Sequence, residues 1–187
     1  MGIELSAETR SVNTKQHLGE LPSFVSLIME RVSLFKKLDY DANIDLDQLT
    51  VNEYPLGVGL SPHIDTHSAF EGSIFSLSLA GPCIMEFRKY PEGGWLSKPA
   101  SNSDREVEGS GSGSNFLGKA IYLPPRSMLL LSGEARYAWH HYIPHHKVDV
   151  VKDSVIRRGS RRVSFTFRKV RKEPCQCRFP QYCDSQR

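Results

Sequence analysis

The chain has 187 residues, 39% of them hydrophobic, which is enough for one domain with its own core or for part of a larger domain. It shows no signal peptide and no long apolar run, which argues against secretion and membrane insertion and predicts a cytoplasmic or nuclear protein. The net charge is only +3, but residues 152–187 carry eleven Lys and Arg against three acidic residues, which is +8 and leaves −5 for the rest. A basic end on an acidic body favours an anionic partner such as RNA or DNA, although a solvated basic tail would look the same.

The first half of the chain predicts a loop, a helix and three strands. Residues 1–19 are polar without a clear period and predict a loop or a frayed end. Pro22 opens a helical pattern that predicts an amphipathic helix covering one side of a sheet. Its apolar residues are Phe24, Ile28, Val32, Phe35 and Leu38. The period changes to two in residues 49–54, a predicted strand with Asn52 and Tyr54 on one face, and residues 74–79 and 83–88 predict two more strands.

The second half contains an irregular stretch and then further strands. Residues 90–118 are rich in Gly, Ser and Pro and predict a flexible insertion, whose Gly-Ser run at 109–114 is either native or an engineered linker. Residues 119–123 and 127–132 predict strands. The clearest strand is 161–169, which places Val163, Phe165 and Phe167 on one face and Arg162, Ser164, Thr166 and Arg168 on the other. That polar face would point to water in an outer strand, but in a small barrel or a double-sheet jelly roll it faces a ligand.

Two histidines and one carboxylate are the donors of a facial triad, which leaves iron(II) with open positions. His63 and Asp65 supply two of these donors at a spacing of two residues. The third has to come from His140, His141, His145 or His146. Arg162 and Arg168 lie six residues apart, about 20 Å along a strand, so they cannot fork one carboxylate together. They can hold the two ends of a short dicarboxylate such as 2-oxoglutarate, with Asn52 and Tyr54 helping at one end.

Four segments in this order resemble the AlkB family of iron(II)- and 2-oxoglutarate-dependent dioxygenases: residues 49–54, 63–65, 133–141 and 162–168. The resemblance implies a mostly β double-stranded β-helix, or jelly roll, with a flanking helix, over residues 20–174. It implies that His63, Asp65 and His141 bind iron and act in catalysis. It also implies that Arg168 lies near the metal-binding end of 2-oxoglutarate, while Arg162, Asn52 and Tyr54, with Ser164, hold the remote carboxylate.

Residues 175–187 form a Cys-rich tail. Cys175, Cys177 and Cys183 supply three thiols, one ligand short of a closed zinc site, and from their spacing alone zinc and three reduced thiols are equally good interpretations. Residues 63–70 and this tail resemble the branch of the family that hydroxylates a wobble uridine in tRNA. That resemblance implies structural zinc on His67 and the three cysteines. Cys83 lies inside a strand pattern and is predicted to be a core residue.

The resemblance implies hydroxylation of 5-methoxycarbonylmethyluridine at the wobble position of tRNA, after a tRNA methyltransferase has acted. It also implies that the family's domain extends before Pro22, so the jelly roll is expected to be incomplete at its N-terminus. Two alternatives stay open at this point. One is oxidative demethylation of alkylated bases in DNA or RNA, and the other is a non-catalytic RNA-binding fragment.

Overall fold

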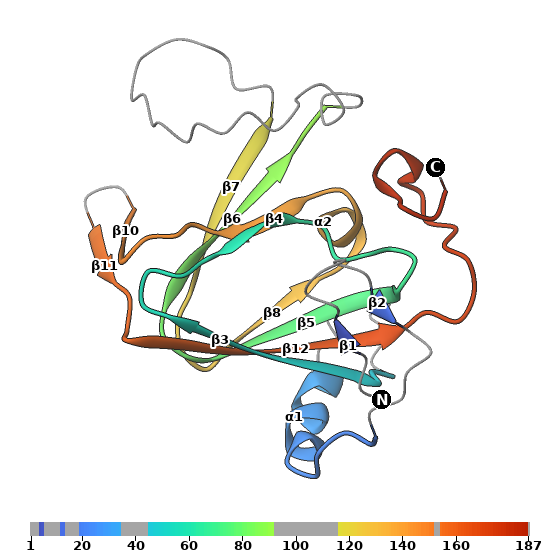
Figure 1. Ribbon diagram of the computed structural model, residues 1–187, viewed down its shortest axis with the longest axis horizontal. Helices are drawn as coiled ribbons and strands as arrows, with labels where there is room; N and C mark the ends of the chain where they lie inside the picture. Colours follow the sequence, from blue (N-terminus) through green and yellow to red (C-terminus); the bar gives the residue numbers. More distant parts are fainter. Residues whose placement is uncertain are drawn as a thin grey trace.

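Two four-stranded antiparallel sheets face each other in the computed structural model (Figure 1). The structure describes residues 4–5, 12–13, 19–34, 45–91, 116–151 and 154–186. Among the described residues, the sheet that contains more residues, called the larger sheet below, has the strand order β3-β12-β5-β8. The second sheet has the strand order β4-β9-β6-β7. Along the chain, β3 to β6 alternate between the two sheets, β7 pairs with β6 in the same sheet, and β8, β9 and β12 alternate again. This arrangement is the predicted jelly roll.

The larger sheet is built around β12. β12 pairs antiparallel with β3 on one side and with β5 on the other, and β8 extends the sheet beyond β5. The bounds are Gln48–Pro55 for β3, Phe70–Ala80 for β5, Ser127–Leu131 for β8 and Arg161–Val170 for β12. All four strands of this sheet were predicted. β3, β5 and β12 extend one to four residues beyond a predicted end, and β8 is one residue shorter than predicted. In β12, Phe167 lies opposite Leu49 and Phe75, so the apolar faces of three strands coincide.

The second sheet contains two strands that periodicity did not predict, because each is only four residues long. These are β4, Leu60–His63, and β9, His140–Ile143. The predicted strands are β6, Cys83–Lys89, and β7, Leu117–Leu123. Strand pairing aligns His63 with His141, His141 with Phe87, and Phe87 with Lys119. These four residues form one row across the sheet, which places two histidines side by side.

Helix α1, Val25–Val32, covers the outer side of the larger sheet. Val25 and Val32 pack with Phe75 and Phe167 in one apolar cluster, as the amphipathic pattern predicted. The helix begins three residues after Pro22, and Phe24 before it is 52% exposed rather than part of the buried face. Phe35 and Leu38 of the predicted helix lie outside the described residues. A second short helix, α2, spans Gly133–Tyr137, and a 3-10 turn, η3, spans Pro180–Tyr182.

Two small hairpins lie outside the sheets. β1, Glu4–Leu5, pairs with β2, Val12–Asn13, so the loop predicted for residues 1–19 was wrong at these four residues. β10, Val148–Val151, pairs with β11, Ser154–Arg157. β7 begins at Leu117, inside the predicted 90–118 insertion, while residues 92–115 with their Gly-Ser run lie outside the described chain.

A second apolar cluster fills the space between the sheets near β6. It contains Cys83, which is fully buried as predicted, together with Met85, Phe87 and Ile143. Beside this cluster the space is lined by polar side chains of β12 that are buried rather than solvated: Arg162, Ser164, Thr166 and Arg168. The inward polar face of β12 therefore lines a cavity. None of the helices in the described residues is long and apolar enough to cross a membrane.

Candidate functional site

His63, Asp65 and His141 meet at one end of this cavity. His63 ends β4, Asp65 lies in the loop that follows, and His141 sits on β9 opposite His63. Each residue offers one ligand atom, and the three atoms lie within 4.8 Å of one another. Asp65 Oδ2 is 3.7 Å from His141 Nε2, and the centroids of the two imidazole rings are 4.3 Å apart. The structure thus brings the predicted iron ligands together.

The protonation states of Asp65 and His141 suit a metal. Burial by itself would raise the pKa of Asp65, but the positive charges of Arg168 and Arg136 outweigh it and hold that pKa well below its usual range. Burial lowers the pKa of His141 to about 3, and His63 acts in the same direction. At neutral pH the carboxylate is therefore ionised and the imidazole is neutral, so their contact is not an ion pair. These are the forms that bind a metal ion.

A backbone carbonyl orients the His63 ring. His63 Nδ1 lies 2.9 Å from the Ser61 carbonyl oxygen. Because a carbonyl oxygen only accepts, Nδ1 carries the proton and Nε2 remains as the ligand atom. Sequence reasoning could not find this partner, since nothing in a sequence shows where a backbone carbonyl points.

The other three candidate histidines lie elsewhere. His140 is buried on the opposite face of β9 from His141, where its ring meets Tyr90 edge-on with centroids 5.3 Å apart. His145 is exposed and lines the cavity, but its Nδ1 accepts a hydrogen bond from the Gly59 amide at 3.2 Å. His146 is exposed and does not line the cavity. Alternation along β9 explains why His141, and not its neighbour, faces Asp65.

Arg168 is bound mainly to protein groups. Its Nε and Nη2 donate to Asp65 Oδ1 at 2.9 and 2.7 Å, and its Nη1 donates to Gln48 Oε1 at 3.2 Å and Thr50 Oγ1 at 3.0 Å. Arg168 therefore holds one oxygen of Asp65 and leaves the other facing His141. Sequence reasoning missed Gln48 and Thr50. A signal was present, because they alternate along β3 on the same face as Asn52 and Tyr54.

Arg162 lies in the same cavity but has a different environment. It is 8% exposed, and its guanidinium donates to the hydroxyls of Ser164 and Ser78, at 3.0 and 3.3 Å. Among the described residues no carboxylate pairs with it, and its Nε is buried without a partner. Tyr54 lies beneath it, with the guanidinium carbon 5.4 Å from the ring centroid, and burial raises the pKa of that phenol. A buried guanidinium without a carboxylate partner is energetically costly, so this position favours the binding of an anion.

The cavity has a volume of about 600 Å³ and lies between the two sheets. Its lining includes both groups of predicted residues: His63, Asp65 and His141 at one end, and Asn52, Tyr54, Arg162, Ser164 and Arg168 along β3 and β12. This volume is within the usual range for sites that bind small molecules.

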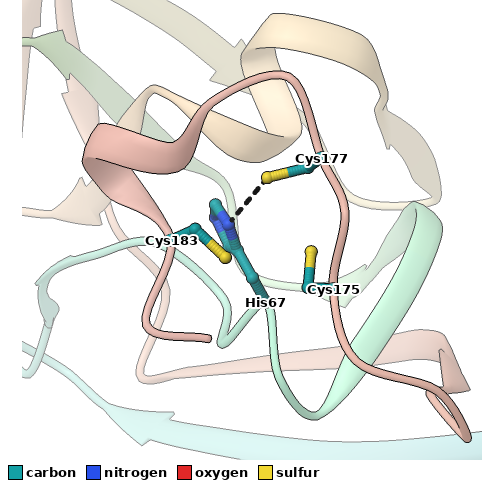
Figure 2. Close-up of side chains that lie close together, drawn as sticks. All are labelled: His67, Cys175, Cys177 and Cys183. Carbon is teal, nitrogen blue, oxygen red and sulfur yellow. Dashed lines mark hydrogen bonds between the residues drawn. The ribbon is translucent and has the colours of Figure 1, made fainter. Parts of the chain in front are cut away.

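A second cluster contains His67, which lies two residues after Asp65 in the chain (Figure 2). His67, Cys175, Cys177 and Cys183 each point one ligand atom at a common centre, and these atoms lie within 4.8 Å of one another. His67 comes from the loop after β4, and the cysteines come from the tail that follows β12. His67 Nδ1 is 3.5 Å from Cys177 Sγ. Three of the four residues are buried and Cys177 is half-buried.

The donors of this second cluster fit zinc. All four described cysteines are free thiols, so no disulfide competes for the three in the tail. One imidazole and three sulfurs make a closed tetrahedral set of the kind found in structural zinc sites. Burial raises the pKa of the Cys177 thiol to about 11, so a metal that binds there has to displace its proton.

Three further groups hold the loop that carries Asp65 and His67, and sequence reasoning gave none of them a role. They are Arg136 on α2, Arg171 after β12 and Asp184 in the tail. They act on backbone atoms, and for that reason their residue types carry no visible signal in the sequence.

The fold and the two-histidine, one-carboxylate cavity define the class of protein. The chain belongs to the 2OG-Fe(II) oxygenase superfamily, whose sequence model matches residues 4–168. The predicted resemblance and the jelly-roll fold are thereby confirmed, and membership of this family implies iron and 2-oxoglutarate.

Individual relatives narrow the class. The chain is 68% identical over 186 residues to an Arabidopsis thaliana protein named alkylated DNA repair protein ALKBH8 homolog, an alignment covering 99% of this chain and 52% of that protein. It is 36% identical over 201 residues to the Xenopus tropicalis tRNA (carboxymethyluridine(34)-5-O)-methyltransferase alkbh8, covering 99% of this chain and 28% of the relative. It is 26% identical over 180 residues to the human alpha-ketoglutarate-dependent dioxygenase alkB homolog 4. The chain thus spans about half, or less, of the length of the first two relatives.

Proposed function

We propose that this chain is an iron(II)- and 2-oxoglutarate-dependent oxygenase that hydroxylates 5-methoxycarbonylmethyluridine at the wobble position of tRNA. One observation carries the first part of the proposal. A three-donor cluster and a buried guanidinium without a carboxylate partner share one cavity. The first suits a metal with open positions, and the second suits the far end of a dicarboxylate.

His63, Asp65 and His141 would hold iron(II), which when bound supplies activation of oxygen at its open positions. The neutral His141 ring and the ionised Asp65 carboxylate need no proton transfer before they act as ligands. Arg168 keeps Asp65 in place by occupying Oδ1 and leaving Oδ2 free. The role of the protein in the reaction would thus be to hold the metal ligands in a fixed geometry at one end of a shielded cavity.

The co-substrate would lie along β12. Arg162, with the Tyr54 hydroxyl, Asn52 and Ser164, would bind the remote carboxylate of 2-oxoglutarate. The six-residue separation of Arg162 from Arg168 supports this placement, because it puts the two ends of the molecule in different environments. The protonated phenol of Tyr54 can donate to a carboxylate, and Arg162 provides the charge.

The tRNA substrate is supported by a relative and by the shape of the second sheet. The Xenopus protein's name describes methyl transfer to carboxymethyluridine at position 34, and such a transfer yields the methyl ester that we propose as substrate. A tRNA methyltransferase acting first is therefore the proposed supplier of that substrate. Lys119 continues the row of His63, His141 and Phe87 onto the exposed edge strand β7, where its positive charge could contact an RNA phosphate. The cytoplasmic or nuclear compartment stays a prediction.

We propose zinc on His67, Cys175, Cys177 and Cys183. The four ligand atoms within 4.8 Å and their burial support a closed structural site with no position left for a substrate. Metal analysis of freshly purified protein that has not met a chelator tests it. We expect close to one equivalent of zinc, and less than half an equivalent would contradict the site.

A second substrate class is oxidative demethylation of alkylated DNA or RNA bases. The observation in its favour is that the Arabidopsis thaliana relative is named an alkylated DNA repair protein. A non-catalytic RNA-binding fragment is the remaining alternative, and the complete set of ligands in the cavity argues against it.

The decisive experiment measures succinate and modified nucleosides in the same reactions. The chain is incubated with iron(II), 2-oxoglutarate and oxygen, and with either tRNA bearing 5-methoxycarbonylmethyluridine or methylated oligonucleotides. The control is a His63→Ala/Asp65→Ala variant. We expect iron-dependent succinate and a hydroxylated uridine only with the tRNA. Turnover of the methylated oligonucleotides alone would contradict the tRNA substrate, and succinate no higher than in the control would contradict the oxygenase.

A further inference from the structure

One short loop serves both clusters. Asp65 and His67 are two residues apart in the segment between β4 and β5, yet their side chains point to different sets of ligands. The Phe70 amide donates to the Thr66 carbonyl at 3.2 Å, which closes the segment into a turn. Any change in the shape of this turn moves ligands of both clusters.

Arg136 holds the loop from the side of α2. Its side chain is 2% exposed and is among the largest fully buried side chains of the described residues. Nη1 donates to the Asp65 carbonyl at 2.7 Å, and Nη2 donates to the carbonyls of Thr66 and Phe70 at 3.3 and 3.2 Å. A planar guanidinium can satisfy three carbonyls in fixed directions, which a lysine cannot do. Arg136 thus fixes the path of the backbone from Asp65 to Phe70.

The C-terminal tail holds the same loop from the other side. Asp184 Oδ1 accepts hydrogen bonds from the amides of His67 and Ser68 at 2.9 and 3.1 Å, and Oδ2 accepts one from the Ser68 hydroxyl. Arg171 Nε donates to the His67 carbonyl at 2.7 Å. Asp184 directly follows Cys183, so a tail that is ordered by its cysteines also places this carboxylate against the loop.

We infer that Arg136 and Asp184 are positioning residues that couple the two clusters, so that a filled His67/cysteine cluster raises the affinity of the His63/Asp65/His141 cluster for a divalent metal. The inference rests on the proposed function in one respect, namely that both clusters bind metals. Coupling of this kind is reciprocal: each metal changes the affinity for the other by the same factor.

The test is the affinity of the full chain for Mn(II), measured from the EPR signal of free Mn(II), with and without one equivalent of bound zinc. Mn(II) suits carboxylate and imidazole rather than thiolate ligands, so it reports on the first cluster. We expect wild-type protein to bind Mn(II) at least about fivefold more tightly when zinc is present. This readout does not depend on turnover.

Two variants and one control assign the effect. Asp184→Ala should retain zinc but show equal Mn(II) affinity in the two zinc states. Glu173→Ala, which removes another exposed carboxylate of the tail, should behave as wild type. Arg136→Lys keeps the charge but not the three directed donors, and it should weaken Mn(II) binding by the zinc-loaded protein about fivefold, so that the two Mn(II) affinities become equal at unchanged zinc content. A merely structural role would lower thermal stability without changing the ratio of the two Mn(II) affinities.

The outcomes separate this inference from the proposed function. If each cluster binds one metal but the wild-type Mn(II) affinity is the same in both zinc states, the coupling is wrong and the oxygenase proposal stands. If Asp184→Ala responds to zinc as wild type does, Asp184 is not the coupling residue and the inference is overturned. If Mn(II) does not bind in either state, both the inference and the proposed iron site are overturned.

Discussion

The two clusters of this protein differ in what surrounds them, although one loop contributes to both. His63, Asp65 and His141 line a cavity of about 600 Å³ and leave one side of the cluster open. His67 and the three tail cysteines surround a buried point with four donors and do not line that cavity. Three donors with space beside them suit a metal that takes part in chemistry, whereas four enclosing donors suit a metal that holds the chain together.

The charges around the clusters differ in the same way. Asp65 is surrounded by guanidinium groups that keep it ionised, and Arg162 provides further positive charge along the cavity. In the cysteine cluster, burial keeps the Cys177 thiol protonated until a metal binds. The first cluster therefore already has the protonation states that suit a metal, whereas a metal at the second cluster would have to displace a proton. Four experiments test this contrast between the two clusters.

The largest effect is expected from His63→Ala, which removes a ligand of the open cluster. Succinate formation should fall by on the order of a thousandfold, equivalent to about 4 kcal/mol of activation free energy. His63 is only half-buried, so the thermal unfolding midpoint should change little. His146→Ala is the matched control, because His146 is exposed outside the cavity. Equal activity in the two variants would contradict the iron site.

The next largest effect concerns the far end of the open cavity. Arg162→Gln should raise the KM for 2-oxoglutarate about tenfold to a hundredfold, because a charge-assisted hydrogen bond in a buried site contributes roughly 1.5–3 kcal/mol. The neighbouring Arg161→Gln is the control: Arg161 is 63% exposed and pairs only with the exposed Glu53. A KM that changes equally in both variants would show that Arg162 does not face the co-substrate.

For the closed cluster, Cys183→Ser should abolish stoichiometric zinc and free the tail. Trypsin cleavage after Arg178 should then become at least about tenfold faster, since the ordering of such a segment depends on its metal. Cys83→Ala removes another fully buried cysteine, one that belongs to the apolar cluster between the sheets, and should leave the zinc content unchanged. Zinc lost from both variants would mean that the loss reflects general unfolding.

The smallest effect tests which cluster the RNA approaches. Lys119 is exposed on β7 in the same row as His63 and His141. Lys119→Ala should weaken tRNA binding about twofold to fivefold and make the affinity less dependent on salt, as expected for one lost phosphate contact. Lys172→Ala, an exposed lysine beside the cysteine tail, should have less effect. The reverse order would place the RNA on the side of the tail.

Much of this architecture could be predicted from the sequence because it depends on local periodicity. The alternation in residues 161–169 identified both faces of β12, and the helical pattern after Pro22 placed α1 against a sheet. The short strands β4 and β9 could not be found in this way, since four residues are too few to show a period. The two-residue strands Glu4–Leu5 and Val12–Asn13 were missed for the same reason.

The candidate site contains features that local sequence patterns cannot reveal. The residue types and order of His63, Asp65, His141, Arg162 and Arg168 are visible in the sequence, and so is the alternation that puts Gln48 and Thr50 with Asn52. Long-range pairing was needed to bring β9 beside β4 and thereby separate His141 from His140. The sequence also could not show that Arg168 is bound to Asp65 while Arg162 has no carboxylate partner among the described residues.

Residue order alone reveals the chemistry that the chain has available: two histidines and a carboxylate, two arginines on one strand face, and three closely spaced cysteines. These follow from residue types and spacing, which are local properties. How these residues are grouped in space depends on the tertiary structure. It joined one loop to a cavity on one side and to the tail on the other, through Arg136 and Asp184, because hydrogen bonds to backbone atoms depend on distance in space and not on position in the chain.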